Sequence, residues 1–247
     1  MQFARCNGVT LHFQTIGAVD AGPLLVFVNS LGTDFRIWRD VVVRFAGDYP
    51  VLTYDLRGHG LSDVGMTPYG LKDHVDDLAA LLDRLGATDA IICGLSVGGQ
   101  IALGLCASRP DLVRALILCD TAPRIGTPES WSARISAVTD DGIEPIADTL
   151  LERWFTPAFR RSENADFQGY RNMLIRQPVA GYIATCAALH DTDLTEVARR
   201  IGVPTLCVVG DGDISTPPAL VASLARLIPG ARATMGALHP GAMSVPA

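Results

Sequence analysis

The chain has no long hydrophobic run, although hydrophobic residues make up 49% of its 247 residues. No apolar stretch reaches the roughly 20 residues that a membrane-spanning helix needs. The opening residues, Met-Gln-Phe-Ala-Arg, do not start the apolar segment of a secretory signal peptide. The sequence therefore predicts no membrane partner, no secretory leader and a cytoplasmic location.

The sequence also lacks a basic cluster. Its 20 Lys and Arg residues are outnumbered by 26 Asp and Glu residues, and the formal net charge is −6. Nucleic-acid-binding domains concentrate positive charge on one face, so this composition disfavours a nucleic-acid partner. An anionic small molecule would need an arginine placed locally in its binding site.

Cysteines are few and scattered, and no two of them have the spacing of a metal site or a redox motif. Most lie inside apolar runs, which is typical of reduced core residues. The sequence thus predicts no metal site. The six cysteines are Cys6, Cys93, Cys106, Cys119, Cys186 and Cys207.

Strand-like and helix-like segments alternate along most of the chain. Continuous apolar runs, typical of strands buried on both faces, occur at residues 24–28, 51–54, 91–93, 115–119 and 205–209. Between them, Leu71, Val75, Leu78, Leu82 and Leu85 are spaced by four and three residues, as in an amphipathic helix. Short connections and this alternation predict an α/β fold, a mostly parallel, doubly wound sheet whose ligands bind at the carboxyl ends of the strands.

Residues 121–193 interrupt this alternation. They show helical patterns and several arginines, but no strand-like run, and they are too long for one connection. We therefore expect an inserted helical cap at 121–193, with a core formed by residues 1–120 and 194–247.

A serine lies at the most informative turn of the chain. Residues 94–98 are Gly-Leu-Ser-Val-Gly, preceded by an apolar strand and followed by a helix. Glycines at both ends allow a tight strand-to-helix turn that exposes the serine. An ordinary glycine-rich turn is the alternative, but it would not need a buried strand before it and a helix after it. The pattern predicts that Ser96 is a catalytic nucleophile.

A serine nucleophile needs a base and a group that orients the base. His239 follows the last expected strand, and Asp213 follows the strand before it, so both are predicted at the carboxyl edge beside Ser96. The chain order Ser, Asp, His fits this architecture. Asp211 is an alternative acid, but Asp213 comes after the first bend of its loop and is preferred.

Two backbone N–H groups are predicted to stabilise an oxyanion. Val97 begins the helix after the serine, where N–H groups are unpaired, and Leu31 lies in the loop after the 24–28 strand. His59 lies in a tight polar loop between glycines, so we expect a structural rather than a catalytic role. Packing is likewise expected for His74.

Longer segments of the sequence resemble the α/β-hydrolase superfamily and, within it, the 3-oxoadipate enol-lactonases. The resemblance covers nearly the whole chain. It includes the loop at 29–33, the Asp-Leu-Arg-Gly-His-Gly loop and the serine turn. The more specific matches lie in the cap, at residues 118–122, 125–128, 152–157, 170–174 and 181–188.

This resemblance implies an α/β-hydrolase fold and an esterase-type reaction. Ser96 would attack the carbonyl of a small anionic enol-lactone, and His239 would accept its proton, with no metal or organic cofactor. The substrate's carboxylate implies a cation in the pocket. Arg134 is the first candidate, and Trp38 and Trp154 are candidate pocket walls.

Two alternatives stay open. A generic carboxylesterase or another lactonase would have an apolar pocket without the carboxylate-binding cation. The second alternative is a binding protein that has the hydrolase fold but turns substrate over slowly. It is supported by Leu238, which directly precedes His239 at a position where the family has glycine.

Overall fold

A computed structural model describes residues 1–236, which form an eight-stranded sheet in the order β1-β2-β4-β3-β5-β6-β7-β8. The first two strand pairs, β1–β2 and β2–β4, are antiparallel, and all later pairs are parallel. The predicted α/β fold with a mostly parallel sheet is confirmed. The strands are β1 Gln2–Cys6, β2 Val9–Ile16, β3 Leu25–Val28, β4 Val51–Tyr54, β5 Ala90–Leu95, β6 Val113–Cys119, β7 Thr205–Gly210 and β8 Arg232–Gly236.

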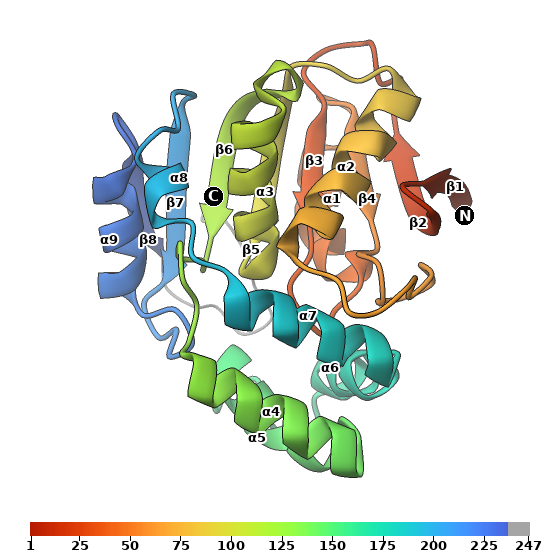
Figure 1. The fold of residues 1–247 in the computed structure, drawn as a ribbon, viewed down its shortest axis with the longest axis vertical. Helices are drawn as coiled ribbons and strands as arrows, with labels where there is room; N and C mark the ends of the chain where they lie inside the picture. Colours follow the sequence, from red (N-terminus) through yellow and green to blue (C-terminus); the bar gives the residue numbers. More distant parts are fainter. Residues whose placement is uncertain (237–247) are drawn as a thin grey trace.

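Helices cover the sheet on both faces (Figure 1). Those of the sheet region are η1 Phe35–Trp38, α1 Arg39–Phe45, α2 Leu71–Leu85, α3 Val97–Ser108, η2 Pro110–Leu112, α8 Thr195–Ala198 and α9 Pro218–Leu227. Helices α2 and α3 pack side by side on one face, and η1 and α1 lie on the other.

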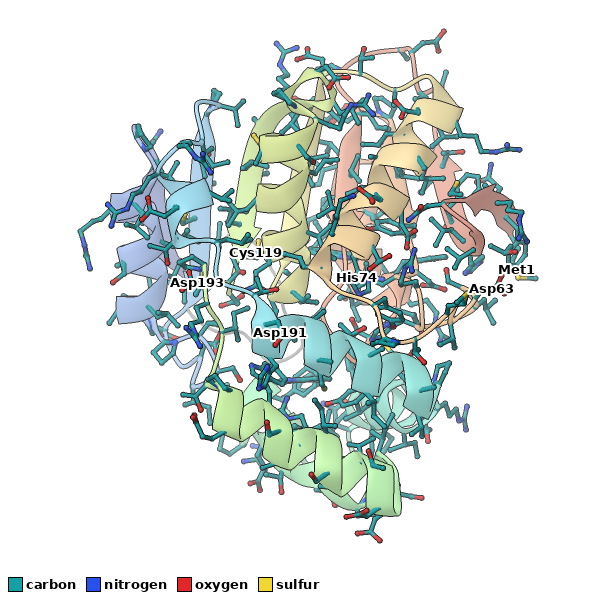
Figure 2. All side chains as sticks on the ribbon, in the orientation of Figure 1. Met1, Asp63, His74, Cys119, Asp191 and Asp193 are labelled. Atoms are coloured by element: carbon teal, nitrogen blue, oxygen red, sulfur yellow. The ribbon has the colours of Figure 1, made fainter. Side chains whose placement is uncertain are left out.

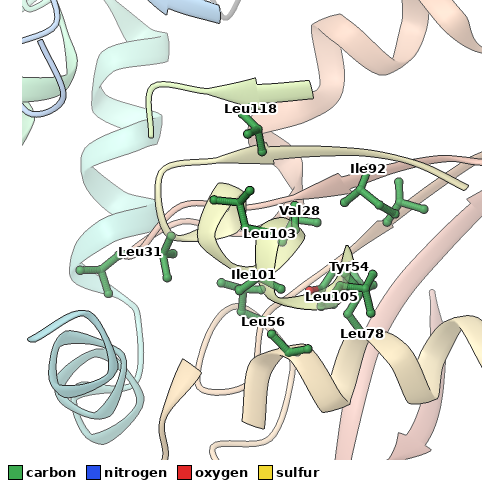
Figure 3. Close-up of a cluster of buried hydrophobic side chains, with 14 of the residues drawn as sticks. Val28, Leu31, Tyr54, Leu56, Leu78, Ile92, Ile101, Leu103, Leu105 and Leu118 are labelled. Atoms are coloured by element: carbon green, nitrogen blue, oxygen red, sulfur yellow. The ribbon is translucent and has the colours of Figure 1, made fainter. Parts of the chain in front are cut away.

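The apolar runs of the strands supply both faces of the core. Along β3, Val26 and Val28 belong to the large cluster under α2 and α3, whereas Leu25 and Phe27 belong to the cluster under η1 and α1. Successive side chains of a strand point to opposite faces, so a strand covered on both sides must be apolar throughout. Figure 3 shows Val28, Ile92 and Leu118 meeting the side chains of α3 in the larger cluster.

A helical insertion between β6 and β7 lies beyond the ends toward which the parallel strands point (Figure 1). It consists of α4 Pro128–Asp141, η3 Glu144–Ile146, α5 Ala147–Trp154, α6 Ala165–Ile175 and α7 Val179–Asp191. Residues 121–193 contain no strand, in agreement with the sequence pattern. We use the term helical insertion for residues 121–193.

The helical insertion touches the loop after β4 through two glycines. A Cβ atom on Gly58 would overlap the backbone of Gly181, and one on Gly181 would overlap the Gly58 carbonyl. Nearby, the Tyr69 hydroxyl donates a hydrogen bond to the Gly181 carbonyl oxygen at 2.8 Å. Backbone therefore packs directly on backbone here, which holds α7 close to the sheet.

Two smaller expectations, on the cysteines and on His74, are also confirmed. All six cysteines are buried and free of disulfides. His74, labelled on α2 in Figure 2, is 1% exposed and packs edge-on against Tyr69. Among residues 1–236, none of the helices combines the length and the apolar character needed to cross a bilayer.

Candidate active site

Ser96 lies on a strained turn between β5 and α3. Its backbone has φ 55° and ψ −119°, a combination that residues other than glycine rarely adopt. A Cβ atom on Gly94 would overlap the Gly98 carbonyl, and one on Gly98 would overlap the Val28 carbonyl. The glycines at both ends thus allow this turn, as the sequence predicted.

The end of β6 holds the Ser96 turn in place. The Ser96 N–H donates to the Cys119 carbonyl at 3.0 Å, and the Thr121 hydroxyl donates to the Ser96 carbonyl at 2.6 Å. A Cβ atom on Gly99 would collide with the Thr121 side chain, so this glycine makes room for that bond. Sequence reasoning missed Thr121, although its place just after a central strand was a usable signal.

The two residues predicted to supply oxyanion-stabilising N–H groups are Leu31 and Val97. Val97 begins α3, and Leu31 lies in the β3–η1 loop that lines the same cavity as Ser96. Within residues 1–236, no hydrogen-bond acceptor occupies the N–H of Leu31 or of Val97. Both N–H groups are therefore without an acceptor among the described residues, and their role stays a prediction.

His59 supports the loop that contains Leu31. Its Nε2 accepts a hydrogen bond from the Gly32 N–H at 3.0 Å, and its Nδ1 lies 3.1 Å from the Arg57 carbonyl, to which it donates. Burial lowers the pKa of His59 to about 4, so the ring is neutral at pH 7. Since His59 is 0% exposed, it is a structural residue and not a base for a bound substrate.

A cavity of about 230 Å³ lies between the carboxyl edge of the sheet and the helical insertion. It brings together Ser96, Leu31, Asp213, Arg134 and Trp154, which the sequence placed in one site. The remaining lining is mixed, with Ile37, Ile125, Trp131, Leu150, Phe155 and Leu189 beside Ser30, Thr33, Asp120, Ser130, Arg153 and Thr216. Such a cavity suits a small, partly apolar molecule with one polar end.

Asp213 accepts three hydrogen bonds in the loop after β7. Its Oδ1 accepts from the N–H groups of Ser215 (2.6 Å) and Thr216 (3.1 Å), and its Oδ2 accepts from the Thr216 hydroxyl at 2.6 Å. The rival residue, Asp211, is exposed and is not among the residues that line the cavity. The geometry favours Asp213 as the acid.

His239 lies outside the described residues, so its role stays a prediction. The described chain ends at Gly236 in β8, which pairs with Gly210 of β7. The Gly236 carbonyl accepts a hydrogen bond from the Asp211 N–H at 3.0 Å. The last described residue therefore lies beside the start of the loop that contains Asp213.

Two arginines of the helical insertion face the cavity. Arg134 on α4 is half-buried and stacks over Trp131 with its guanidinium 4.7 Å from the ring centre. Arg153 on α5 donates to the Ser215 hydroxyl at 3.2 Å. In the part of the chain that the structure describes, neither arginine has an ion pair with an acidic side chain. Both charges are therefore available to an anion in the cavity.

The prediction that Trp38 forms a wall of the pocket was wrong. Trp38 is 1% exposed, and its ring packs on Phe27 on the face of the sheet away from α3. Its indole N–H donates to the Asn29 side-chain oxygen at 2.8 Å, so it supports the β3–η1 loop that contains Leu31. The adjacent Ile37 reaches the cavity instead.

Asp120 is a second acid in the cavity that sequence reasoning missed. It is the first residue after β6, and its carboxyl group is hydrogen-bonded to Asp213. Burial, followed by the proximity of Asp213, raises the pKa of Asp120 to about 7.

No group of His, Cys, Asp and Glu side chains within residues 1–236 is arranged to hold a metal ion.

Comparison with known proteins places this geometry in a family. A model of the alpha/beta hydrolase fold matches residues 23–239. The chain is 36% identical over 211 residues to 3-oxoadipate enol-lactonase 2 of Acinetobacter baylyi, covering 85% of this chain and 79% of that protein. It is 30% identical to 2-(acetamidomethylene)succinate hydrolase of Mesorhizobium japonicum, covering 90% and 81%.

A solved structure agrees with these sequence relatives. The enol-lactonase from Burkholderia xenovorans superposes with a TM-score of 0.92 at 35% identity, covering 95% of this chain and 90% of that one. The chain therefore belongs to the α/β-hydrolase family and is a hydrolase enzyme.

Proposed function

We propose that this hydrolase opens 3-oxoadipate enol-lactone to 3-oxoadipate, a step of the β-ketoadipate pathway of aromatic catabolism, in the cytoplasm. The observation that carries the proposal is one cavity containing Ser96 on its strained turn, Asp213 and the free charge of Arg134. The enol-lactonase relatives support the substrate class.

In this mechanism, the Ser96 hydroxyl attacks the lactone carbonyl while His239 takes its proton, with Asp213 orienting the imidazole. The N–H groups of Leu31 and Val97 stabilise the tetrahedral oxyanion. Collapse opens the ring to an acyl-enzyme and an enolate, which becomes a ketone on protonation. Water activated by His239 then hydrolyses the acyl-enzyme and frees Ser96.

The arginines of the helical insertion account for the anionic substrate. A carboxylate beside Arg134 would be paired in a partly buried, apolar setting, where a charge-assisted hydrogen bond is stronger than in water. Trp131 holds the guanidinium in place by stacking. We accordingly propose that residues 121–193 form a cap that reads the substrate, over a catalytic core of residues 1–120 and 194–247.

The decisive test is hydrolysis of 3-oxoadipate enol-lactone, followed by loss of the lactone chromophore. Saturable turnover is expected for the purified chain. In Ser96→Ala and His239→Ala, kcat should fall by about 10⁴-fold or more, because either change removes the triad as a unit. A folded but inactive wild type, or an active Ser96→Ala variant, contradicts the proposal.

The acid is tested by two substitutions in one loop. Asp213→Asn should lower kcat/KM by about 10³- to 10⁴-fold, because an amide favours the wrong imidazole tautomer. Asp211→Asn is the matched control and should retain wild-type activity. The opposite result would assign the acid to Asp211.

The mixed lining of the cavity also fits a second candidate, an esterase or lactonase for neutral substrates. Arg134→Met separates the two candidates. If the enol-lactone is the substrate, KM for it should rise by about 10- to 100-fold, while hydrolysis of the neutral 4-nitrophenyl acetate changes little, because only the lactone carries a carboxylate. Equal effects on both substrates favour the neutral-ester function. No turnover of either substrate by wild type favours a binding protein.

A further inference from the structure

Asp120 is fixed between the ends of two neighbouring strands. Its backbone has φ 42°, in the left-handed region, and its N–H donates to the Val208 carbonyl of β7 at 2.9 Å. Its Oδ1 accepts from the Gly210 N–H, also at 2.9 Å. An aspartate tolerates this backbone conformation better than most residues do. The carboxyl group is thus held in one orientation, toward the loop that contains Asp213.

A hydrogen bond between two carboxyl groups requires a proton, because ionised carboxylates only accept. Asp213 has three donors on its oxygens, from Ser215 N–H, Thr216 N–H and Thr216 Oγ, so both of its oxygens already act as acceptors. Asp120 has one donor, the Gly210 N–H. The shared proton therefore belongs to Asp120, which donates to Asp213.

The surroundings of Asp120 agree with this placement. Asp213 faces it from the β7–α9 loop, and the buried thiol of Cys119 precedes it on β6. The cations Arg134 and Arg153 line the same cavity from α4 and α5. Burial and the proximity of Asp213 raise the pKa of Asp120 to about 7, although the Gly210 N–H acts in the opposite direction.

We propose that Asp120 is a positioning residue that, in its protonated form, donates a hydrogen bond to Asp213 and fixes the carboxylate that orients His239. The proposal rests on the proposed function for the roles of Asp213 and His239. It assigns Asp120 no contact with the reacting atoms. When Asp120 ionises, the bond to Asp213 is lost and two like charges face each other.

Asparagine is the informative replacement for Asp120. Its side-chain oxygen can accept from the Gly210 N–H, and its amide can donate to Asp213, without a titratable proton. Alanine removes both bonds. Asp120→Asn therefore mimics the protonated state at every pH, whereas Asp120→Ala mimics its loss.

The kinetic test measures kcat/KM for 4-nitrophenyl acetate from pH 6 to pH 9 in wild type, Asp120→Asn and Asp120→Ala. The ratio of Asp120→Asn to wild type should rise by roughly three- to tenfold, with its midpoint near pH 7. Asp120→Ala should be roughly tenfold below Asp120→Asn throughout, the worth of one hydrogen bond. A ratio that does not vary with pH overturns the proposal, as does equal activity of the two variants.

A second measurement does not depend on turnover. The infrared band of a protonated carboxyl group should appear in the wild-type-minus-Asp120→Asn difference spectrum at pH 6 and disappear at pH 9. Absence of this band at pH 6 overturns the proposal whether or not the protein is active. Activity retained in Ser96→Ala would instead overturn the proposed function, and the infrared result would still decide the protonation of Asp120.

Discussion

Gly98 is the residue at which the serine turn touches the end of β3 and the β3–η1 loop. A Cβ atom there would overlap the Val28 carbonyl and lie 2.7 Å from the Asn29 carbonyl, both backbone atoms that cannot rotate away. We expect Gly98→Ala to lower the free energy of unfolding by about 2 kcal/mol or more, because β3 or α3 must shift. Activity should fall with it, since the two oxyanion donors separate.

A second glycine provides the control for Gly98→Ala. Gly169 lies within α6, where an added Cβ would meet nothing within 4 Å. Gly169→Ala should raise the free energy of unfolding by about 0.5–1 kcal/mol through helix propensity. Urea denaturation of both variants tests the pair, and a neutral Gly98→Ala contradicts the contact.

The residues predicted from the sequence were those whose chemistry is local. The glycines around Ser96 indicate the turn, because a backbone reversal this tight leaves no room for a Cβ atom at those positions. The prediction for Trp38 was wrong and Asp120 was missed, because the contacts of both side chains depend on segments that lie elsewhere in the chain. The indole of Trp38 finds its partner, Asn29, across a loop, and Asp120 meets Asp213 only through the pairing of β6 with β7.

At the scale of elements, a buried ion pair joins the β4 loop to α2. The Arg57 guanidinium donates to both carboxylate oxygens of Asp77, at 2.6 and 2.5 Å, with side chains 5% and 1% exposed. Asp77→Ala leaves the buried Arg57 cation with Asp73, which is 3.6 Å away and 44% exposed, in place of its buried partner. The free energy of unfolding should therefore fall by about 3–5 kcal/mol. Chemical denaturation measures the loss.

The neighbouring residue on α2 supplies a matched comparison. Asp76 pairs with Lys72 four residues away, but these side chains are 40% and 83% exposed. Asp76→Ala should cost about 0.5 kcal/mol or less, because water screens an exposed pair. Similar losses for Asp76→Ala and Asp77→Ala would show that burial does not set the strength of the Arg57 pair.

Element boundaries were predictable where a pattern has clear ends. Helix α2 occupies residues 71–85 and β4 residues 51–54, as the periodicity and the apolar run indicated. Strand β6 starts at Val113, two residues before its apolar run. Arg114 interrupts the apolar pattern but not the strand, because its side chain is exposed. Helix α3 starts at Val97, directly after the serine, as expected from the sequence.

At the scale of the whole molecule, buried histidines make stability depend on pH. His59 has a pKa of about 4 in the folded chain against about 6.5 when unfolded. Between these values the unfolded state binds more protons, so the free energy of unfolding rises with pH. Burial also lowers the pKa of His74, which acts in the same direction.

This linkage predicts a difference between two chains. From pH 4.5 to pH 7, the free energy of unfolding should rise more steeply in wild type than in His59→Gln, whose amide does not titrate in this range. The difference should be on the order of 2 kcal/mol across the range. Equal slopes in urea titrations would show that His59 is not buried in its neutral form.

The contact between Gly58 and Gly181 limits how this enzyme can vary. Any side chain at either position would push α7 away from the β4 loop, and a change at one position cannot be repaired by the other, which already has no side chain to lose. A mutant library built to retarget the substrate should therefore keep both glycines constant and place its diversity on α4 and α5. The same two positions should remain glycine in laboratory evolution even after the specificity of the pocket has been replaced.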